Sequence, residues 1–212
     1  MKVRKTISNF ESEYIKLPSP RYDGEISVEK ALKERRSIRS YKDDPLTLSE
    51  ISQLLWAAQG VTDTVSGYYL RTAPSAGALY PLELYVMTGN VDDLPPGIYK
   101  YDPFQHELAQ TMKEDKRIDL FNAALKQSCI KNAPASILIA CVYRRMTNKY
   151  GERANRYALI EVGHAAQNIY LQAFSLKIGA VFIGAFYDEK VKMIMNMPDD
   201  EDPLCIMPIG KY

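Results

Sequence analysis

The chain has 212 residues, of which 46% are hydrophobic and 25% charged, so it can bury a core and is not a disordered chain. Its 27 basic and 26 acidic residues leave a net charge of +1, which argues against a nucleic-acid-binding surface or a polybasic membrane surface. Three scattered cysteines indicate reduced thiols in a cytoplasmic protein, and two histidines leave little material for a metal site, so we expect none.

The N-terminal segment predicts an extended arm. Residues 1–26 contain Pro18, Pro20 and Gly24 but no apolar run, so we expect neither a signal peptide nor a membrane-spanning segment. No repeat or linker follows the arm. Residues 1–212 are therefore predicted to form a single domain.

Two helices are predicted directly after the arm. Ser27 is suited to N-cap a short helix over residues 28–35. Thr47 and Glu50 have the spacing of a capping box, and the helix that follows carries apolar residues at helical intervals as far as Gly60. Both helix starts are therefore indicated by side-chain chemistry as well as by periodicity.

The rest of the pattern mixes strands and helices without strict alternation, which favours the α+β class. A helix is expected over residues 115–125, and Asp188 is expected to cap another. The run 135–142 is continuously apolar, as is typical of a central strand buried on both faces. Runs bounded by turn residues predict strands over 82–88, 98–101, 135–142, 179–186 and 204–209.

From residue 155 to residue 175 the sequence is helical in composition and apolar almost all round. A surface helix would show one polar face. We therefore expect a central helix, or a helix whose outer face is covered by a partner subunit.

Arg35-Arg36-Ser37-Ile38-Arg39 is the first segment that carries chemistry. Arg35 and Arg39 point the same way in a helix or a strand, and Ser37 joins them only in a strand. Guanidinium groups present planar forks of donors that fit a phosphate or another anionic edge. Taken alone, the segment also fits a solvated basic helix end, which is the more common use of a short arginine pair.

A second segment, residues 72–81, is a loop of small residues between two prolines. Such a loop lets its backbone approach a flat ligand and offer N–H donors to it. A tight turn packed on the core would explain the glycine and one proline, but explains the run of four small residues, Ser75–Ala78, less well.

The third segment, residues 179–185, has two glycines in an apolar run. Glycines in a buried strand often mark the close approach of a ligand or another backbone. No Lys-Ser/Thr pair follows Gly184 and no GxGxxG is present, which argues against both a phosphate loop and a Rossmann site. Glu161-x-x-His164 matches half of a di-iron motif, but two histidines cannot complete it, and His164 is expected to pack on its helix.

Together these segments resemble the nitroreductase superfamily, and within it the SagB-type dehydrogenase group. The resemblance runs from about Ser27 to the C-terminus. Its motifs are Glu34–Tyr41, Pro74–Pro81, and the stretch from Tyr157 to Asn168 that continues to Ile183–Phe186. In this order and spacing the motifs are specific.

The resemblance implies a nitroreductase-like fold, with a central mixed sheet flanked by helices, in an intertwined homodimer that holds two FMN molecules at its interface. Arg35, Arg36 and Ser37 would hold the FMN phosphate and ribityl region. Arg39 would lie near the pyrimidine edge of the ring, where a cation stabilises negative charge. Lys211 would approach the phosphate.

Backbone and small side chains would complete the FMN site on this resemblance. N–H groups near Gly184 would face flavin N5 and O4. The contributing residues are Ile183, Gly184 and Ala185 on one side and, from the second subunit, Pro74, Ser75, Ala76, Gly77, Ala78 and Leu79 on the other.

The sequence departs from many nitroreductases at two of these positions. Ala78 stands where an Asn often reaches the flavin, and Gly184 replaces a common acidic residue. Both departures fit the SagB-type branch better. Lys149-Tyr150 resembles a Lys-Tyr pair that acts in proton transfer in azoline-oxidising relatives, so these two residues are the catalytic candidates.

The predicted activity is that of an FMN-dependent oxidoreductase that passes electrons through flavin N5 in a ping-pong cycle. NAD(P)H is a candidate co-substrate, and a small organic molecule or a peptide is the candidate substrate. A fragmenting or dehalogenating flavoenzyme is a second hypothesis, although no long lid insertion is visible. A non-catalytic FMN carrier or partner protein is a third.

Overall fold

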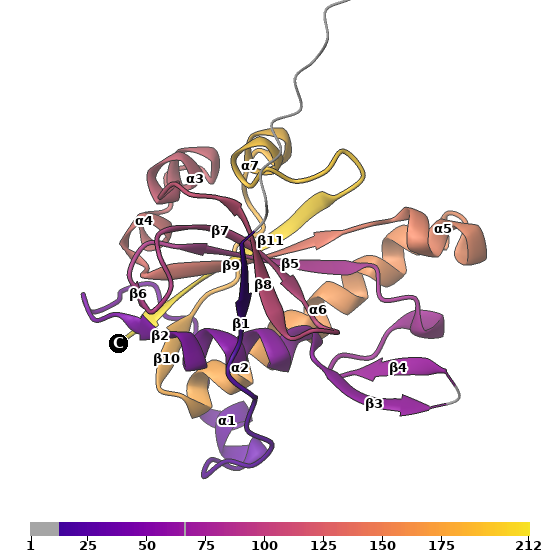
Figure 1. The fold of residues 1–212 in the computed structure, drawn as a ribbon, viewed down its shortest axis with the longest axis horizontal. Coiled ribbons are helices and arrows are strands. Elements are labelled where there is room, and N and C mark those ends of the chain that lie inside the picture. The colour runs from indigo at the N-terminus through magenta and orange to yellow at the C-terminus, as the bar shows by residue number, and fades with distance from the viewer. Residues whose placement is uncertain (1–12, 66) are drawn as a thin grey trace, which may run out of the picture.

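The computed structural model describes residues 13–65 and 67–212, and its centre is a seven-stranded sheet (Figure 1). The strand order is β1-β8-β7-β5-β9-β11-β10, and each neighbouring pair is antiparallel. A parallel bridge between Ser37 and Ala180 extends the β10 edge, so the sheet is mixed at that point. The strands are β1 (Tyr14–Lys16), β5 (Leu82–Thr88), β7 (Gly97–Asp102), β8 (Glu107–Met112), β9 (Ala135–Cys141), β10 (Ile178–Ala180) and β11 (Asp202–Lys211).

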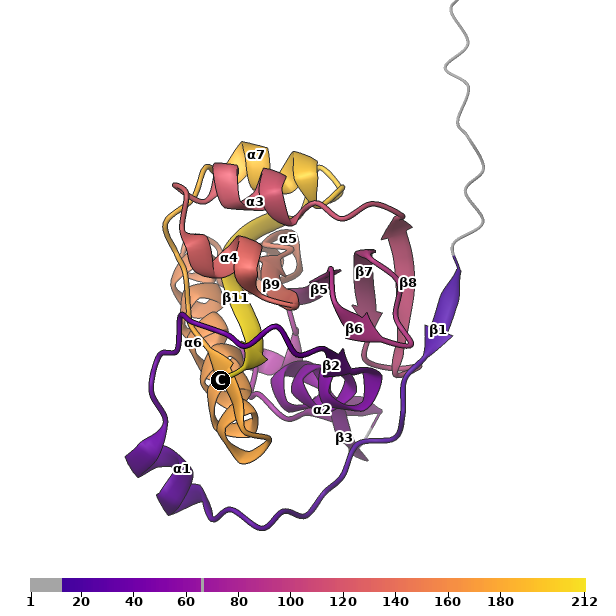
Figure 2. The ribbon, with the colours of Figure 1, turned by 90° about the vertical axis from the view of Figure 1, so that its left-hand side faces the viewer.

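Helices cover both faces of this sheet. Helices α2 and α6 pack on one face, and α3, α4 and α7 pack on the other, as Figure 2 shows. The helices are α1 (Val28–Glu34), α2 (Leu48–Gln59), α3 (Arg117–Ala123), α4 (Ser128–Asn132), α5 (Arg144–Tyr150), α6 (Arg153–Ser175) and α7 (Asp188–Ile194). Smaller elements are the parallel pair β2 (Leu46–Thr47) and β6 (Val91–Asp92), the hairpin β3 (Val61–Val65) and β4 (Tyr68–Arg71), and the 3₁₀ turn η1 (Ala76–Ala78). The predicted α+β class is confirmed.

Strand β9 runs through the middle of the core. All 7 of its residues are buried, and it pairs with β5 on one side and β11 on the other. Because successive side chains of a strand point to opposite faces, Ile137 and Ile139 join the cluster under α2 and α6, whereas Leu138 and Ala140 join the cluster under α3 and α7. The prediction of a central strand buried on both faces is confirmed.

The two predicted helix starts are also confirmed. Ser27 Oγ accepts a hydrogen bond of 3.2 Å from the Lys30 N–H at the start of α1. At the start of α2, Thr47 Oγ1 accepts from the Glu50 N–H at 3.3 Å, and Glu50 Oε2 accepts from the Thr47 N–H at 2.9 Å. Each bond satisfies an N–H group that has no partner within its helix.

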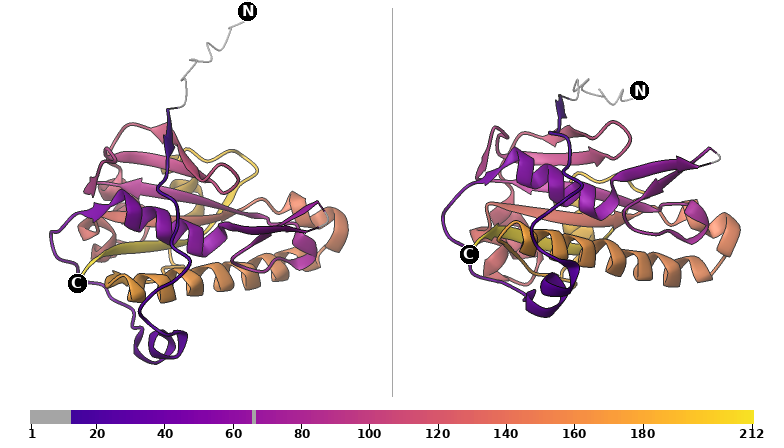
Figure 3. Two further views of the ribbon diagram at one scale, coloured as in Figure 1. Left: turned by 60° about the horizontal axis from the view of Figure 1, so that its bottom comes forward. Right: turned by 90° about the horizontal axis from the view of Figure 1, so that it is seen from below.

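Helix α6 runs along the whole length of the sheet and continues from α5 (Figure 3). Its inner face, including Val162 and Ile169, is buried in the core. Its outer face leaves Leu159 58% exposed and Ile160 50% exposed. The long helix is therefore confirmed. Its apolar residues lie both on the face packed in the core and on the exposed face.

Two predictions near the C-terminal end are wrong. The strand expected over 179–186 ends at Ala180, and Ile183 makes only an isolated bridge to Ile206. The apolar run continues because Val181 and Ile183 still pack into the core after the ladder ends. Asp188 is the first residue of α7 and does not cap it, since Tyr187 holds the N-cap position without a side-chain hydrogen bond.

Part of the predicted N-terminal arm is anchored to the sheet. Residues 1–12 lie outside the described part of the chain, and β1 then pairs with β8. His106 holds the next stretch, because its Nε2 lies 3.0 Å from the Pro18 carbonyl oxygen and 2.8 Å from Ser52 Oγ. The arm is therefore fastened to both β8 and α2.

Candidate active site

The Arg35–Arg39 segment leaves α1 and runs beside the edge of the sheet. Ser37 forms the parallel bridge with Ala180, and the Ile38 N–H donates to the Ala180 carbonyl oxygen at 2.9 Å. The segment is therefore extended here, which is the conformation that places Ser37 on the same side as the first and last arginines. Ile38 packs inward on Gly179, where an added Cβ would lie 2.6 Å from Ile38 Cγ2.

Tyr170 of α6 ties this segment to the chain that follows β10. Its hydroxyl lies 3.1 Å from Ser37 Oγ and accepts a hydrogen bond of 2.7 Å from the Phe182 N–H. The Arg35 guanidinium lies over its ring, 4.9 Å from the centroid. Tyr170 lies in the stretch 155–175, which is apolar almost all round in sequence, so this role was not predicted. Its hydroxyl was the signal, since a tyrosine O–H in a packed helix usually has a partner.

The three arginines differ in how many of their donors are used. Arg36 turns back along α1, and its Nη1 donates to the carbonyl oxygens of Lys33 and Arg35 at 3.0 Å and 2.9 Å. These bonds satisfy carbonyl groups at the end of the helix. Arg39 is exposed, and neither its side chain nor that of Arg35 donates a hydrogen bond to any described residue. Arg35 and Arg39 therefore have more unused hydrogen-bond donors than Arg36.

Two successive peptide groups are exposed beyond the bridge at Ile183. Ile183 and Ile206 exchange N–H···O bonds of 2.9 Å in both directions, which fixes the backbone just before Gly184. Within the described ranges, the N–H groups of Gly184 and Ala185 donate to no protein acceptor, and both residues are exposed. The Ala185 carbonyl oxygen accepts from Gln127 Nε2 at 3.2 Å. These N–H groups are therefore available to the acceptor edge of a ligand.

The small-residue loop Pro74–Leu79 is held by α6. Glu161 is only 4% exposed, and its Oε1 accepts a hydrogen bond of 2.9 Å from the Ala76 N–H. Burial raises the pKa of Glu161, although the bond from Ala76 opposes that shift. Ala78 has a φ of 53°, a left-handed conformation that is strained for any residue with a Cβ. The loop is therefore fixed in a conformation it would not adopt alone.

Lys149 and Tyr150, at the end of α5, lie against this loop. A Cβ added to Gly77 would be 2.7 Å from Lys149 Nζ and 2.7 Å from Tyr150 Oη, so both polar atoms meet the bare backbone of Gly77. Tyr150 is held in turn by Tyr157, whose ring meets it edge to face at 5.0 Å. The structure thus brings the two catalytic candidates together with the predicted cofactor loop.

The residues around Arg35 and those around Gly77 are not adjacent within one chain. The first group contacts α6 at Tyr170, and the second contacts α6 at Glu161. Nine residues of helix separate these two positions, which corresponds to about 13 Å along the axis. One chain therefore carries two separate groups of candidate residues.

Lys211 has a carboxylate partner of its own. Its Nζ pairs with Glu50 of the α2 capping box, and its carbonyl oxygen accepts a hydrogen bond of 2.9 Å from the Lys42 N–H. The next residue, Tyr212, lines a small cavity together with Arg35 and Arg36. The end of β11 thus lies beside the arginine segment, with the Lys211 ammonium directed to Glu50.

The three cysteines, Cys129, Cys141 and Cys205, are free and buried, and burial raises the pKa of each thiol. In the part of the chain that the structure describes, no group of three His, Cys, Asp or Glu side chains is placed to hold a metal ion. No helix among those residues is long and apolar enough to cross a bilayer.

The order of these elements matches a known family. Residues 32–211 match the family model described as the nitroreductase family. The chain belongs to the nitroreductase family. The match covers the arginine segment, the small-residue loop, α6 and the chain around Gly184, which are the motifs that carried the resemblance.

Individual relatives agree with this assignment. The chain is 47% identical over 187 residues to MJ1384 of Methanocaldococcus jannaschii, a protein named for the nitroreductases, and the match covers 88% of this chain and 92% of that one. A crystal structure named for a nitroreductase of Ralstonia eutropha has a TM-score of 0.81 at 30% identity, covering 94% of this chain and 89% of that chain. The predicted nitroreductase-like fold is therefore confirmed.

A third similarity lies among toxin-processing proteins. The trifolitoxin-processing protein TfxB of Rhizobium leguminosarum is 32% identical over 140 residues, covering 60% of this chain and 37% of that protein. Together with the family match, this similarity supports the predicted resemblance to the SagB-type group. As a member of the nitroreductase family, the protein is an oxidoreductase of the flavin-using type.

Proposed function

We propose that this nitroreductase is an FMN-dependent oxidoreductase that works as a homodimer. The observation that carries the proposal is the arrangement around Tyr170, which joins the arginine segment to the chain leading to two free peptide N–H groups. Cationic donors suit a phosphate, and a pair of N–H donors suits the acceptor edge of a flat ring. FMN carries both features in one molecule.

The residues present fit FMN. Arg35 and Ser37 would bind the phosphate and ribityl oxygens, and Arg39 would favour negative charge at the pyrimidine edge of the ring. Gly184 and Ala185 would donate their free N–H groups to the ring. Bound FMN would supply two-electron chemistry, which side chains cannot provide. Arg36 and Lys211 would contribute only after giving up part of their present contacts with α1 and Glu50.

The outer face of α6 supports the proposed homodimer. Leu159 and Ile160 are exposed there, and a Cβ added to Gly163 would meet no atom within 4 Å. A glycine inside an exposed helix costs about 1 kcal/mol relative to alanine, and the close approach of a second helix is one reason to keep it. A partner on this face would bring its own Pro74–Leu79 loop toward the FMN held at Arg35.

Lys149 and Tyr150 are proposed to move a proton during substrate turnover. Both have a polar group at Gly77, in the loop proposed to line the cofactor. A lysine ammonium and a phenol can each donate a proton to a reacting atom within hydrogen-bonding distance, and the amine and phenolate that result can accept one. A Cβ at position 77 would collide with both polar atoms, so the glycine allows them to lie against the loop.

The substrate is proposed to be a small organic molecule or a peptide, with NAD(P)H as the second redox partner. The peptide alternative is supported by the similarity to TfxB, a protein named for toxin processing. A cytoplasmic location is proposed because three free thiols suit a reducing compartment.

The absorption spectrum of the purified protein tests the cofactor. We expect a yellow protein whose flavin bands bleach when NADH or NADPH is added anaerobically and return with an acceptor. A colourless protein that takes up no added FMN would falsify the cofactor proposal. A yellow protein that no reductant or candidate substrate bleaches would indicate a carrier, and mass spectrometry of the products would reveal a fragmenting or dehalogenating reaction.

A further inference from the structure

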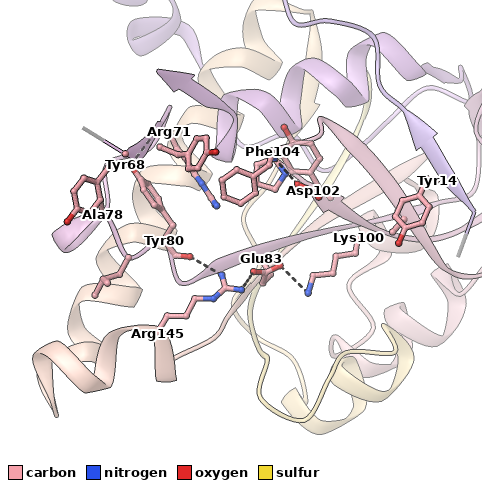
Figure 4. Close-up of a pocket in the computed structure, with 16 residues that line it drawn as sticks. Tyr14, Tyr68, Arg71, Ala78, Tyr80, Glu83, Lys100, Asp102, Phe104 and Arg145 are labelled. Atoms are coloured by element: carbon pink, nitrogen blue, oxygen red, sulfur yellow. Dashed lines mark hydrogen bonds and ion pairs between the residues drawn. The ribbon is translucent and has the colours of Figure 1, made fainter. Parts of the chain in front are cut away.

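A cleft of about 610 Å³ opens where the β3–β4 hairpin meets the turn between β7 and β8 (Figure 4). This volume is in the range of pockets that hold small molecules. Its walls come from β4, the chain after η1, β5, β7 and α5. Among the residues proposed to bind FMN, only Ala78 and Leu79 line it, so it is a separate cavity beside the same loop.

The floor of the cleft carries charges that balance one another. Glu83 Oε2 lies 3.0 Å from Lys100 Nζ, and Glu83 Oε1 lies 2.5 Å from Arg145 Nη2. Lys100 also pairs with Glu201, which is buried behind it. The carboxylate of Asp102 accepts N–H bonds within its own turn. Two carboxylates and two cations therefore balance one another, and the negative charge of Asp102 is stabilised by the N–H groups of its own turn.

Arg71, on the wall of the cleft, has no such balance. Its guanidinium lies between two rings, 4.6 Å from the Tyr80 centroid and 5.2 Å from the Phe104 centroid. Its Nη1 donates to the neutral Gln59 amide at 3.1 Å, and no carboxylate among the described residues forms an ion pair with it. Burial lowers the pKa of Arg71, and the charge of Glu83 only partly offsets this. The cation is therefore poorly compensated.

Two donor atoms of Arg71 are left without acceptors. Nε is buried and has no hydrogen-bond partner in the described structure, whereas buried donors are usually paired. Nη2 has no partner there either, but it is not sealed from solvent. Figure 4 shows the side chain reaching from β4 toward the space between Tyr80 and Phe104. An anion in the cleft could reach Nη2 directly.

Aromatic side chains form the rim of the cleft. Tyr68 is 62% exposed and Phe104 is 53% exposed, and Tyr14 of β1 stands at the opposite end. Large exposed aromatic residues gathered around a concavity are typical of a site that receives a ring. The rim and Arg71 thus indicate different parts of one ligand.

We propose that this cleft binds a planar, ring-bearing carboxylate, with the carboxylate on Arg71 Nη2 and the ring against the aromatic rim. The carboxylate supplies the charge partner that Arg71 lacks, through a charge-assisted hydrogen bond. The cleft shares Ala78 and Leu79 with the loop proposed to line FMN. A compound of this class is therefore the substrate class of the oxidoreductase, and in that respect the inference rests on the proposed function.

Titration calorimetry on the full chain as purified tests the binding directly. Three probes separate the two parts of the ligand: 2-naphthoate has ring and charge, 2-naphthamide has the ring alone, and acetate has the charge alone. We expect 2-naphthoate to bind about tenfold more tightly than 2-naphthamide, since a hydrogen bond to a charged group contributes at least that factor. Acetate should not bind measurably. Equal affinities for naphthoate and naphthamide would overturn the proposal.

Variants assign the charge to Arg71. Arg71→Gln should lose about tenfold in affinity for 2-naphthoate while its weak affinity for 2-naphthamide stays unchanged. Arg144→Gln is the matched control, because Arg144 precedes Arg145 on α5 but points outward and pairs with Asp200. Unchanged naphthoate binding in a folded Arg71→Gln protein would overturn the proposal. If that variant does not fold, as a thermal melt would show, Arg71→Lys and the wild-type probe comparison decide the question.

The flavin spectrum separates this inference from the proposed function. A colourless protein that still prefers 2-naphthoate would support the carboxylate site and overturn the cofactor proposal. If NAD(P)H bleaches a yellow protein that binds the two naphthalene probes equally, the carboxylate site is overturned and the oxidoreductase proposal stands.

Discussion

Two positions on α6, Glu161 and Tyr170, support two groups of candidate residues that are built in opposite ways. At Tyr170, the arginine segment and the chain near Gly184 leave their donors open to solvent. At Glu161, the loop around Gly77 is held by the bond from the Ala76 N–H, its backbone is strained, and the lysine and tyrosine of α5 lie against its glycine. The first group is suited to take up a ligand, and the second is suited to hold reactive groups in fixed positions.

This difference teaches that the two groups should respond differently to substitution. Changes in the open group should alter how much FMN is bound. Changes to the lysine and tyrosine of the closed group should alter turnover while bound FMN stays the same. The following variants test that division.

The largest effect is expected from Lys149→Ala, in the closed group. Removal of a proton-transfer group lowers the rate by about 10² to 10⁴-fold. Steady-state turnover should fall by this factor, while the flavin content measured by absorbance stays at the wild-type level. Arg144→Ala, also on α5 but paired with Asp200, is the control that should retain activity. Wild-type turnover in Lys149→Ala would remove this residue from the mechanism.

The next effect concerns the open face of α6. Ile160→Glu places a charge on an exposed position, so the folded chain tolerates it, but a helix packed against this face would not. We expect monomers by light scattering and loss of FMN. Ile118→Glu, on the 59% exposed Ile118 of α3, is the control and should leave both unchanged. Ile169 cannot serve as the probe, because it is fully buried in its own chain. A dimer that persists in Ile160→Glu would move the interface elsewhere.

Gly77→Ala changes the loop of the closed group, and Gly67→Ala, outside that group, is its matched control. Both glycines have positive φ, 65° and 82°, so each alanine costs about 1 kcal/mol of folding free energy from backbone strain. Only at Gly77 does the new Cβ meet Lys149 and Tyr150, whereas at Gly67 it meets no atom within 4 Å. Turnover should therefore fall only in Gly77→Ala. Equal turnover in the two variants would show that the contact has no catalytic consequence.

The smallest effect is a pH dependence at Glu161. Burial raises its pKa above the ordinary value, so the folded chain holds the proton more tightly than the unfolded chain, and stability falls as the pH rises through and above about 4.5. Glu161→Gln keeps an acceptor for the Ala76 N–H and removes the charge. In denaturant melts the variant should match wild type at acid pH and be the more stable of the two at neutral pH. A Gln variant that is less stable at neutral pH would contradict this sign.

Local chemistry made much of the fold predictable. The caps at Ser27 and Thr47 are short-range hydrogen bonds between residues three apart, so their sequence spacing is sufficient to predict them. Strand β9 is predictable because its run is apolar without interruption. The β3–β4 hairpin was not predicted, since its strands are short and mostly exposed and show no clear apolar alternation.

The candidate site was predictable only in part, because its decisive contacts span long sequence separations. The arginine segment, the loop and the chain near Gly184 each carry a local composition that indicates backbone approach or charge. Tyr170 contacts Ser37 from 133 positions away, and its hydroxyl gives no sign of that partner in sequence. The lack of a carboxylate partner for Arg71 likewise becomes visible only in the structure, where the side chain lies between Tyr80 and Phe104.

The spacing of Glu161 and Tyr170 on one continuous helix has a consequence for how the cofactor is retained. Nine residues correspond to about two and a half turns, so the two side chains leave α6 in opposite directions. Each chain would then carry two incomplete parts of an FMN site, one at Tyr170 and one at Glu161. Each FMN would be enclosed only by parts from different chains. Retention of FMN should therefore weaken on dilution of the protein, because the binding equilibrium is linked to association of the subunits.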